Sequence, residues 1–273
     1  MTDSSPPRLT VQGLAAGYPN RRVIEGLDLR LTPGAVTMII GANACGKSTL
    51  LGTLARVHPP LGGRIELDGV DIATVSRRRF AQNVGLLPQH PTAPDGLTVA
   101  ELVSRGRHPH RGVFQRWSAA DTARVDDAMA KTRVADLADR AVGDLSGGQR
   151  QRVWIAMALA QEPRILLLDE PTTFLDLSHQ IEVLDLLREL NRTDGTTIVA
   201  VLHELNLAAR YADELVVMSG GRVVAHGAPT DVLTSAVVAE AFGLDAVVMP
   251  DPLTATPLVI PVPGGVHAAT DAG

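Results

Sequence analysis

The chain has 273 residues, 45% of them hydrophobic, which is enough apolar material for one large or two smaller domains. Asp and Glu (30) outnumber Lys and Arg (25), and the longest basic run is the triplet at residues 77–79, so we expect no nucleic-acid partner. The single cysteine excludes an internal disulfide and fits a reducing compartment. No apolar stretch approaches the ~20 residues of a membrane span, and residues 1–10 lack the pattern of a signal peptide. We therefore expect a cytosolic protein, or one held at a membrane by a partner.

The first predicted elements are strands. Residues 9–11 and 23–31 read as two strands, with Tyr18 in the loop between them. A Pro-Gly turn then leads into residues 36–40 (VTMII), a short β-branched and apolar run suited to a buried parallel strand. A helix is predicted over residues 49–55, so a loop joins the strand at 36–40 to this helix.

That loop, residues 41–49 (GANACGKST), fits the pattern G-x-x-x-x-G-K-[ST] of a phosphate-binding loop. Backbone N–H groups and the positive end of the helix dipole favour phosphate oxygens at such a place. Lys47 is expected to reach the β- and γ-phosphates, and the Ser48 hydroxyl to hold Mg²⁺. The ATP-binding residues predicted in the loop are Gly41, Ala42, Asn43, Ala44, Cys45, Gly46, Lys47, Ser48 and Thr49.

The middle of the chain changes from strands to helices. Strands are predicted at residues 62–69 and 84–87, with a short basic helix between them and Gln89 just after the second strand. From about residue 97 to 145 capping boxes open two helices, at Thr98 and at Ser118, so we expect an inserted helical subdomain. Its predicted loop at 106–112 contains a His-x-His pair, which we do not assign to a metal because no further ligand has suitable spacing.

Two later segments carry polar groups where burial makes them costly. Ser146 is the predicted N-cap of a helix whose first turn holds Gly147 and Gly148, each costing about 1 kcal/mol relative to Ala. Such a cost suggests that a phosphate approaches this backbone closely. Residues 164–170 (RILLLDE) read as a buried strand that ends in two carboxylates, and the first matches the Asp that holds Mg²⁺ in P-loop NTPases. The second, Glu170, could accept a proton from the attacking water.

The last third of the chain also contains a buried strand that ends at a polar residue. A helix is predicted over residues 177–190, and a buried strand at 197–202 ends at His203. Because Gln89, Asp169, Glu170 and His203 all follow strands, we expect them along one sheet edge near the γ-phosphate. A hairpin at residues 214–225 and one helix over residues 229–242 follow, and the tail is predicted to form a short hairpin and then fray.

The loop at 41–49, the LSGGQ of residues 145–149, the ILLLDE strand and His203 occur in this order. On these motifs the chain resembles the ATPase subunit of ATP-binding cassette (ABC) transporters over residues 8–245. The resemblance implies an α/β fold: a P-loop NTPase core with a mixed sheet, an antiparallel β subdomain and an inserted helical subdomain at about residues 90–150. Residues 246–273 would be a partly disordered tail.

Residue roles follow from the resemblance by position. Tyr18 corresponds to the aromatic that stacks on adenine, and Gln89 to the residue that senses Mg²⁺ and the attacking water. Asp169 corresponds to the magnesium-associated Asp, Glu170 to the catalytic base and His203 to the γ-phosphate switch. The signature that closes on ATP of the opposite subunit is Ser146, Gly147, Gly148 and Gln149, and the residue between paired sites is Asp176. Many members have Gly where Ala44 stands, and a positive φ there would cost Ala about 1 kcal/mol.

The phrases GLTVAELVSRGRHPH, DEPTTFLDLSHQIEVLDLL and DPLTATPLVIP resemble the ferric-siderophore, haem and cobalamin import branch. The resemblance implies an ATPase that uses ATP and Mg²⁺, pairs as a homodimer when ATP is bound, and energises ferric-siderophore uptake. It would lie at the cytoplasmic face of the membrane under two permease subunits and act indirectly with an extracytoplasmic substrate-binding protein. Alternatives are haem or cobalamin import, or a soluble cassette of the iron-sulfur cluster assembly type. We expect the permease to dock on exposed positions of the helical subdomain such as Arg105 and Arg107.

Overall fold

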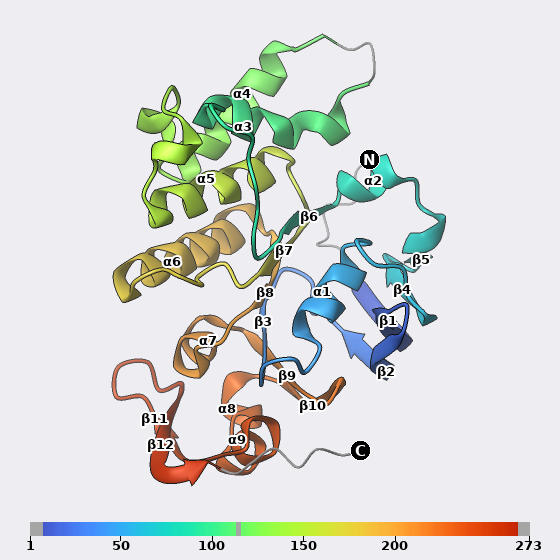
Figure 1. The fold of residues 1–273 in the computed structure, drawn as a ribbon, viewed down its shortest axis with the longest axis vertical. Coiled ribbons are helices and arrows are strands. Elements are labelled where there is room, and N and C mark those ends of the chain that lie inside the picture. The colour runs from blue at the N-terminus through green and yellow to red at the C-terminus, as the bar shows by residue number, and fades with distance from the viewer. Residues whose placement is uncertain (1–7, 113–115, 267–273) are drawn as a thin grey trace. The chain divides into compact units, whose positions relative to one another are not determined.

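The computed structural model of the protein describes residues 8–112 and 116–266 (Figure 1). The chain divides into two compact units. The strand-rich unit holds residues 8–71 and 199–266, and the helix-rich unit holds residues 72–112 and 116–198. In these ranges no helix combines the length and the apolar composition that a membrane crossing requires.

An antiparallel sheet begins the strand-rich unit, and its strand order is β2-β1-β4-β5. The strands are β1 (Leu9–Tyr18), β2 (Arg21–Arg30), β4 (Gly62–Leu67) and β5 (Val70–Asp71). Gly63 approaches β1 so closely that a Cβ would lie 2.3 Å from the carbonyl oxygen of Gly13, and its φ of 73° favours glycine as well. The predicted antiparallel subdomain is confirmed, with a β1 longer than the residues 9–11 expected from sequence.

A mixed sheet forms the centre of the same unit. The strands of this sheet that lie wholly within the unit are β3 (Val36–Gly41), β9 (Glu214–Ser219) and β10 (Arg222–Gly227). All residues of β3 are buried, as predicted for a central parallel strand, and β3 pairs in parallel with β9. The antiparallel pair β9–β10 turns at Gly220 and Gly221, whose φ angles of 52° and 76° suit a tight hairpin. A further strand, β8 (Thr197–Val201), begins in the helix-rich unit and ends in this one.

The helices of the strand-rich unit differ from the prediction at one place. They are α1 (Lys47–Leu54), α7 (Leu205–Tyr211), α8 (Pro229–Val232) and α9 (Ser235–Phe242). The prediction of a single helix over residues 229–242 is wrong, because the helix is interrupted between α8 and α9. At the break, Thr234 has extended backbone and its hydroxyl accepts a hydrogen bond from the Val237 N–H, which makes it the N-cap of a new helix.

The C-terminal hairpin consists of β11 (Leu244–Pro250) and β12 (Pro257–Val266), which pair in an antiparallel register. A side chain of α7 occupies the free edge of β12. The Asn206 amide nitrogen donates to the Val259 carbonyl at 3.2 Å, and the Val259 N–H donates to the Asn206 carbonyl oxygen at 2.7 Å. These two bonds satisfy the backbone of Val259 as a neighbouring strand would.

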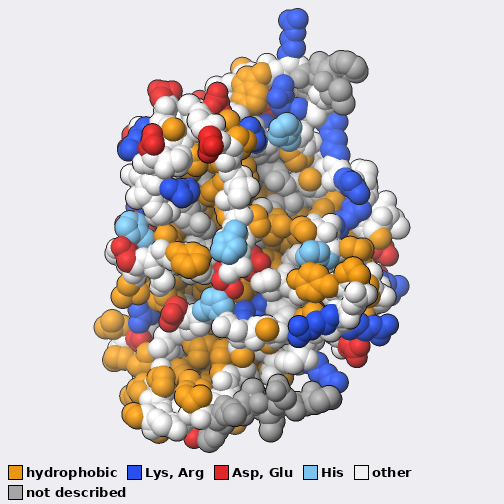
Figure 2. Space-filling model, in the orientation of Figure 1, with side chains coloured by type: hydrophobic (Ala, Val, Ile, Leu, Met, Phe, Trp, Pro, Cys, Tyr) orange, Lys and Arg blue, Asp and Glu red, His pale blue; other side chains and the backbone are white. Residues whose placement is uncertain are grey.

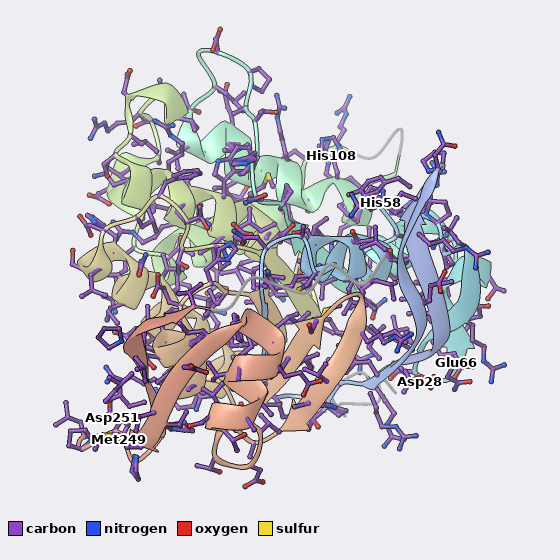
Figure 3. All side chains as sticks on the ribbon, turned by 60° about the horizontal axis from the view of Figure 1, so that its bottom comes forward. Asp28, His58, Glu66, His108, Met249 and Asp251 are labelled. Atoms are coloured by element: carbon purple, nitrogen blue, oxygen red, sulfur yellow. The ribbon has the colours of Figure 1, made fainter. Side chains whose placement is uncertain are left out.

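The outward face of the hairpin is apolar. The cross-strand pair Val247 and Ile260 is exposed, as is Met249, and apolar side chains gather over β11 and β12 at the lower left of Figure 2. Figure 3 shows Asp251 beside Met249 at one end of the hairpin, where its carboxylate accepts from the Leu253 and Thr254 N–H groups and from Arg210. The short hairpin predicted for the tail is present, whereas the fraying predicted after it concerns residues 267–273, which lie outside the described residues.

The helix-rich unit surrounds a pair of parallel strands, β6 (Val84–Leu87) and β7 (Ile165–Asp169). Its α-helices are α2 (Arg77–Ala81), α3 (Val99–Ser104), α4 (Ala119–Lys131), α5 (Gly147–Ala160) and α6 (Leu177–Asp194). Short 3₁₀ helices are η1 (Ile72–Thr74), η2 (Arg105–His110), η3 (Ala135–Leu137) and η4 (Val142–Asp144). The capping boxes predicted at Thr98 and Ser118 are both formed, and α3 and α4 pack on α5, so the inserted helical subdomain is confirmed.

Residues 106–112 do not form the loop predicted from sequence, because most of them belong to η2. Gly106 allows η2 to approach α5, since a Cβ there would lie 2.1 Å from the Met157 carbonyl oxygen. His110 of the His-x-His pair places its Nε2 2.7 Å from the Gln161 carbonyl oxygen. Contacts between distant parts of the chain fix this segment, and no local pattern in the sequence reports them.

Arg107 was expected at an exposed docking surface, and this expectation is wrong because the residue is only 6% exposed. Its guanidinium contacts the Asp121 carboxylate at 3.1 Å and the Glu162 carboxylate at 2.7 Å, and it donates to the Ala160 carbonyl. Arg107 therefore joins η2, α4 and the end of α5. Arg105, the other residue named for docking, is exposed as expected.

Replacing Arg107 with Leu is expected to destabilise the protein by about 3 kcal/mol, because it leaves the buried Asp121 carboxylate without its cationic partner. Arg105→Leu is the matched control, and a substitution at this exposed position is expected to cost less than about 0.5 kcal/mol. Denaturant titration of both variants gives the free energies of unfolding. Equal values would contradict a structural role for Arg107.

Candidate nucleotide-binding and hydrolysis site

The predicted phosphate-binding loop connects β3 to α1. Gly41 has a φ of 154°, and a Cβ there would lie 2.2 Å from the Met218 carbonyl oxygen of β9, so the loop begins where only glycine fits. Gly46 has a φ of 107° and stands directly before α1. Ala44 also has a positive φ, 61°, which costs a residue with a Cβ about 1 kcal/mol. The backbone strain that the sequence analysis described for Ala44 is therefore present.

Lys47 is buried at the start of α1. Its ammonium group donates to the carbonyl oxygens of Gly41 and Ala42, at 2.8 and 2.9 Å. The positive charge thus lies against the loop, where the N-terminal N–H groups of α1 add to its attraction for anions. Ser48 is exposed in the same helical turn. This arrangement suits the phosphate chain of a nucleotide.

Tyr18 lies at the end of β1 with half of its side chain exposed. Its ring meets the ring of His58 edge to face, with centroids 5.7 Å apart and an interplanar angle of 66°. The His58 ring in turn covers Gly52 of α1, where a Cβ would lie 2.8 Å from its Cδ2 (His58 is labelled in Figure 3). His58, which the sequence analysis did not select, thus connects Tyr18 with the helix that follows the phosphate loop.

Gln89 and Glu170 follow two neighbouring parallel strands, β6 and β7. The Gln89 Nε2 donates to the Glu170 Oε2 at 2.5 Å, and the Thr173 hydroxyl donates to the same oxygen at 3.0 Å. Glu170 has a φ of 52°, a conformation that costs a residue with a Cβ about 1 kcal/mol and that occurs often at functional sites. Asp169 ends β7 and is half-buried. The structure therefore brings together two of the predicted catalytic side chains.

The signature segment begins α5 as predicted. The Ser146 hydroxyl accepts from the Gln149 N–H at 3.3 Å, and the Gln149 side-chain oxygen accepts from the Ser146 N–H at 3.1 Å. Gly147 is exposed, but Gly148 is buried. A Cβ at Gly148 would lie 2.3 Å from the Cδ2 of His179. The need for glycine at this position thus has a reason inside the chain, besides the approach of a phosphate that the sequence suggested.

Asp176 is the N-cap of α6, and its carboxylate accepts from the His179 N–H at 2.9 Å. Hydrogen bonds from the His179 N–H, the Ser178 hydroxyl and the His179 ring lower the pKa of Asp176 to about 2. Nearby, the exposed ring of Phe174 stacks on His90 with centroids 6.1 Å apart. Sequence reasoning missed His179, His90 and Phe174, although each stands within a few residues of a predicted site residue.

His203 is exposed and follows β8 in the strand-rich unit, together with the phosphate loop. Gln89, Asp169 and Glu170 belong to the helix-rich unit. The common edge expected for these four residues stays a prediction. The described residues contain no group of three or more His, Cys, Asp or Glu side chains arranged as a metal site. A phosphate loop between a buried parallel strand and a helix nevertheless defines the class: this is a P-loop nucleotide-binding protein of the α/β type.

Comparisons with known proteins identify the family. Residues 24–173 match the model of the ABC transporter family. The chain is 52% identical to the achromobactin transport ATP-binding protein of Dickeya dadantii, over 93% of this chain and 94% of that protein. It is 49% identical to the ferric enterobactin transport ATP-binding protein of Escherichia coli, over 96% of each. The protein therefore belongs to the ABC transporter family, as an ATP-binding subunit and an ATPase.

Further relatives and solved structures agree. An ATP-binding protein of Bacillus subtilis assigned to a siderophore transport system is 49% identical over 93% of this chain and 92% of that protein. A cobalamin import ATP-binding protein of Halobacterium salinarum is 41% identical over 96% of this chain and 66% of that protein. An inward-facing ABC transporter assigned to the metal-chelate type has a TM-score of 0.81 at 30% identity, covering 94% of this chain and 98% of that chain. A dimeric cassette bound to ADP and phosphate has a TM-score of 0.70 at 26% identity, covering 81% and 98%.

Alkylation of Cys45, the single cysteine, is expected to be slow and to abolish ATP binding. Burial raises the pKa of this thiol, although the Lys47 ammonium opposes the shift, so little reactive thiolate exists near pH 7 and labelling should accelerate as the pH rises. The added group would fill the loop that must surround the phosphates, and ATP should protect the thiol. Mass spectrometry measures labelling, and Cys45→Ser is the unlabelled control. Normal ATP binding by the alkylated protein would show that the loop does not surround the phosphates.

Proposed function

We propose that this ATPase subunit energises the import of a ferric siderophore. The observation that carries the proposal is the similarity over nearly the whole chain to proteins named for ferric enterobactin and siderophore transport. The solved structure of an ABC transporter assigned to the metal-chelate type aligns with 94% of this chain, which supports the same class of cargo.

ATP binds at the phosphate loop of residues 41–49. The Lys47 ammonium, which lies against the loop, meets the β- and γ-phosphates, and the half-exposed Tyr18 ring stacks on adenine. The Ser48 hydroxyl, the Asp169 carboxylate and the Gln89 amide oxygen would hold Mg²⁺, because this ion prefers hard oxygen ligands. When bound, this ion would neutralise charge that develops on the transferred phosphoryl group.

Glu170 is the general base of hydrolysis. Its Oε2 receives hydrogen bonds from Gln89 and Thr173, so the carboxylate is held in place and can take a proton from water that attacks the γ-phosphate. Because the Gln89 amide donates to the Glu170 carboxylate, a movement of Gln89 would directly affect the position of the base. His203, after β8, contacts the γ-phosphate and distinguishes ATP from ADP.

The working form is a homodimer while ATP is bound. Ser146, Gly147, Gly148 and Gln149 then meet ATP held by the opposite subunit, and Asp176 lies between the two sites. The dimeric cassette among the solved structures supports this arrangement. Two permease subunits hold the dimer at the cytoplasmic face of the membrane, and a substrate-binding protein outside the cytoplasm delivers the cargo to them.

Coupling to the permease runs from Gln89 through the following segment into the helical subdomain, which provides the docking surface. Exposed Arg105 remains a docking residue, whereas Arg107 is assigned to the interior of the subdomain. Salt bridges with Asp121 and Glu162 hold Arg107 in place, so a displacement of η2 would be transmitted to α4 and to the end of α5.

Glu170→Gln is expected to bind ATP as the wild type does and to hydrolyse it at least a hundredfold more slowly. The amide keeps the size of the side chain but cannot accept the proton, so an ATP-bound dimer should accumulate. Single-turnover hydrolysis and size-exclusion chromatography measure these two properties, with the wild-type protein as the reference. Hydrolysis within about tenfold of the wild-type rate would exclude Glu170 as the base.

Deleting the gene is expected to abolish uptake of iron-labelled siderophore and to slow growth when that siderophore is the only iron source. Growth on abundant free iron should be unaffected, and the wild-type gene but not Glu170→Gln should restore uptake. Failure on cobalamin or haem instead would move the cargo to those classes, and the cobalamin relative makes the first of them the main alternative. Co-purification with soluble proteins only, and no polytopic membrane protein, would favour a soluble cassette of the iron-sulfur cluster assembly type.

A further inference from the structure

One short stretch of chain in the same unit, residues 175–179, lies beside both glycines of the signature segment, of which Gly147 is exposed and Gly148 is buried. A Cβ at Gly147 would lie 3.6 Å from a methyl carbon of Leu175, and a Cβ at Gly148 would lie 2.3 Å from the ring of His179. The first distance is an ordinary contact, but the second is too short for any side chain. Gly148 therefore lets the His179 imidazole lie directly on the backbone of the first turn of α5.

A hydrogen bond fixes the orientation of this imidazole. The His179 Nδ1 lies 2.7 Å from the Asp176 Oδ1, an oxygen that also accepts from the His179 N–H. The carboxylate of Asp176 remains ionised at neutral pH because its pKa is about 2, so it is a permanent acceptor and Nδ1 is the donor. The Asp176 loop, which is the segment that ends at Asp176 directly before α6, and the signature backbone thus contact the same ring from two sides.

We propose that His179 is a positioning residue that aligns the signature backbone with the Asp176 loop of the same subunit. The inference rests on the proposed function, in which the signature and Asp176 both act at the paired ATP sites. A displacement of Asp176 would be passed through the imidazole to Gly148. Occupancy of one ATP site would thereby influence the signature that serves the other, because one rigid group connects the two segments.

A second contact between the same two helices provides a matched control. One turn further along, the Arg152 guanidinium lies 2.5 Å from the Glu182 carboxylate, which also joins α5 to α6. This ion pair touches neither the signature glycines nor Asp176. Its removal tests whether any weakening of the α5–α6 contact has the same effect as the loss of His179.

His179→Phe keeps a ring over Gly148 but removes the donor to Asp176. We expect kcat for ATP hydrolysis by the purified subunit to fall about tenfold, because a small misplacement of a positioning group is costly in turnover. KM for ATP and the midpoint of thermal unfolding should stay close to the wild-type values. Glu182→Gln should keep kcat within about twofold of wild type. Wild-type kcat in His179→Phe, or an equal loss in Glu182→Gln, would overturn the proposal.

A pair of variants at Gly148 tests the contact itself. Gly148→Ala should lower the midpoint of thermal unfolding in the wild-type background, because the new methyl group collides with the His179 ring. In a His179→Ala background the same change should leave the midpoint unchanged or raise it, since alanine is the better helix former. Equal losses in both backgrounds would show that His179 does not occupy this place.

These measurements are separate from those that test the proposed function. Glu170→Gln and siderophore uptake decide the chemistry and the cargo, whereas the His179 series uses only turnover, KM and unfolding of the isolated subunit. Loss of the siderophore assignment would leave the His179 result intact. A failure of the His179 series would leave Glu170 as the base and the cargo unchanged.

Discussion

The buried ammonium of Lys47 depends on two carbonyl oxygens of the loop that precedes it, and the strand-rich unit is built so that this loop keeps its shape. An unpaired ammonium in this position would be too costly to bury. The loop starts at Gly41, which can pack closely against the Met218 carbonyl of β9 because it has no Cβ. Strand β9 is in turn held in place by its parallel pairing with β3. The charge, the glycine and the central strands therefore require one another.

Local sequence patterns predicted local structure well. The strand at 84–87, the phosphate loop and the capping boxes at Thr98 and Ser118 were all visible from sequence because neighbouring residues determine them. The hairpin at Gly220 and Gly221 belongs to the same group, since its turn requires two residues with positive φ. The contact between Gln89 and Glu170 could be anticipated because the carboxyl ends of neighbouring parallel strands meet.

The predictions that failed depended on contacts between distant residues. Arg107 looked like a surface charge because its partners Asp121 and Glu162 stand 14 and 55 residues away. The break between α8 and α9 has no proline or glycine to mark it, and only the capping hydroxyl of Thr234 gives a signal. His179 was overlooked because a histidine in a polar helical turn is unremarkable until the facing residue is known to be glycine.

The residues of the proposed nucleotide site have two kinds of support. Ala44 and Glu170 both have positive φ angles, so backbone strain is accepted at these two positions. Firm hydrogen bonding is found around them, with Glu170 held by two donors and Lys47 by two acceptors. Together these features hold the polar groups in place before any ligand binds, which is what electrostatic catalysis requires.

The amide of Asn206 has a consequence for the behaviour of the protein at high concentration. A hairpin with an apolar outer face and an open backbone edge is a template on which further chains can add as strands. Asn206 bonds to both backbone groups of Val259 and so interrupts the row of free donors and acceptors along β12. The amide oxygen and nitrogen of one side chain thereby cover part of this backbone edge, and conversion of the amide to a carboxylate would remove the donor to the Val259 carbonyl while leaving an acceptor for the Val259 N–H.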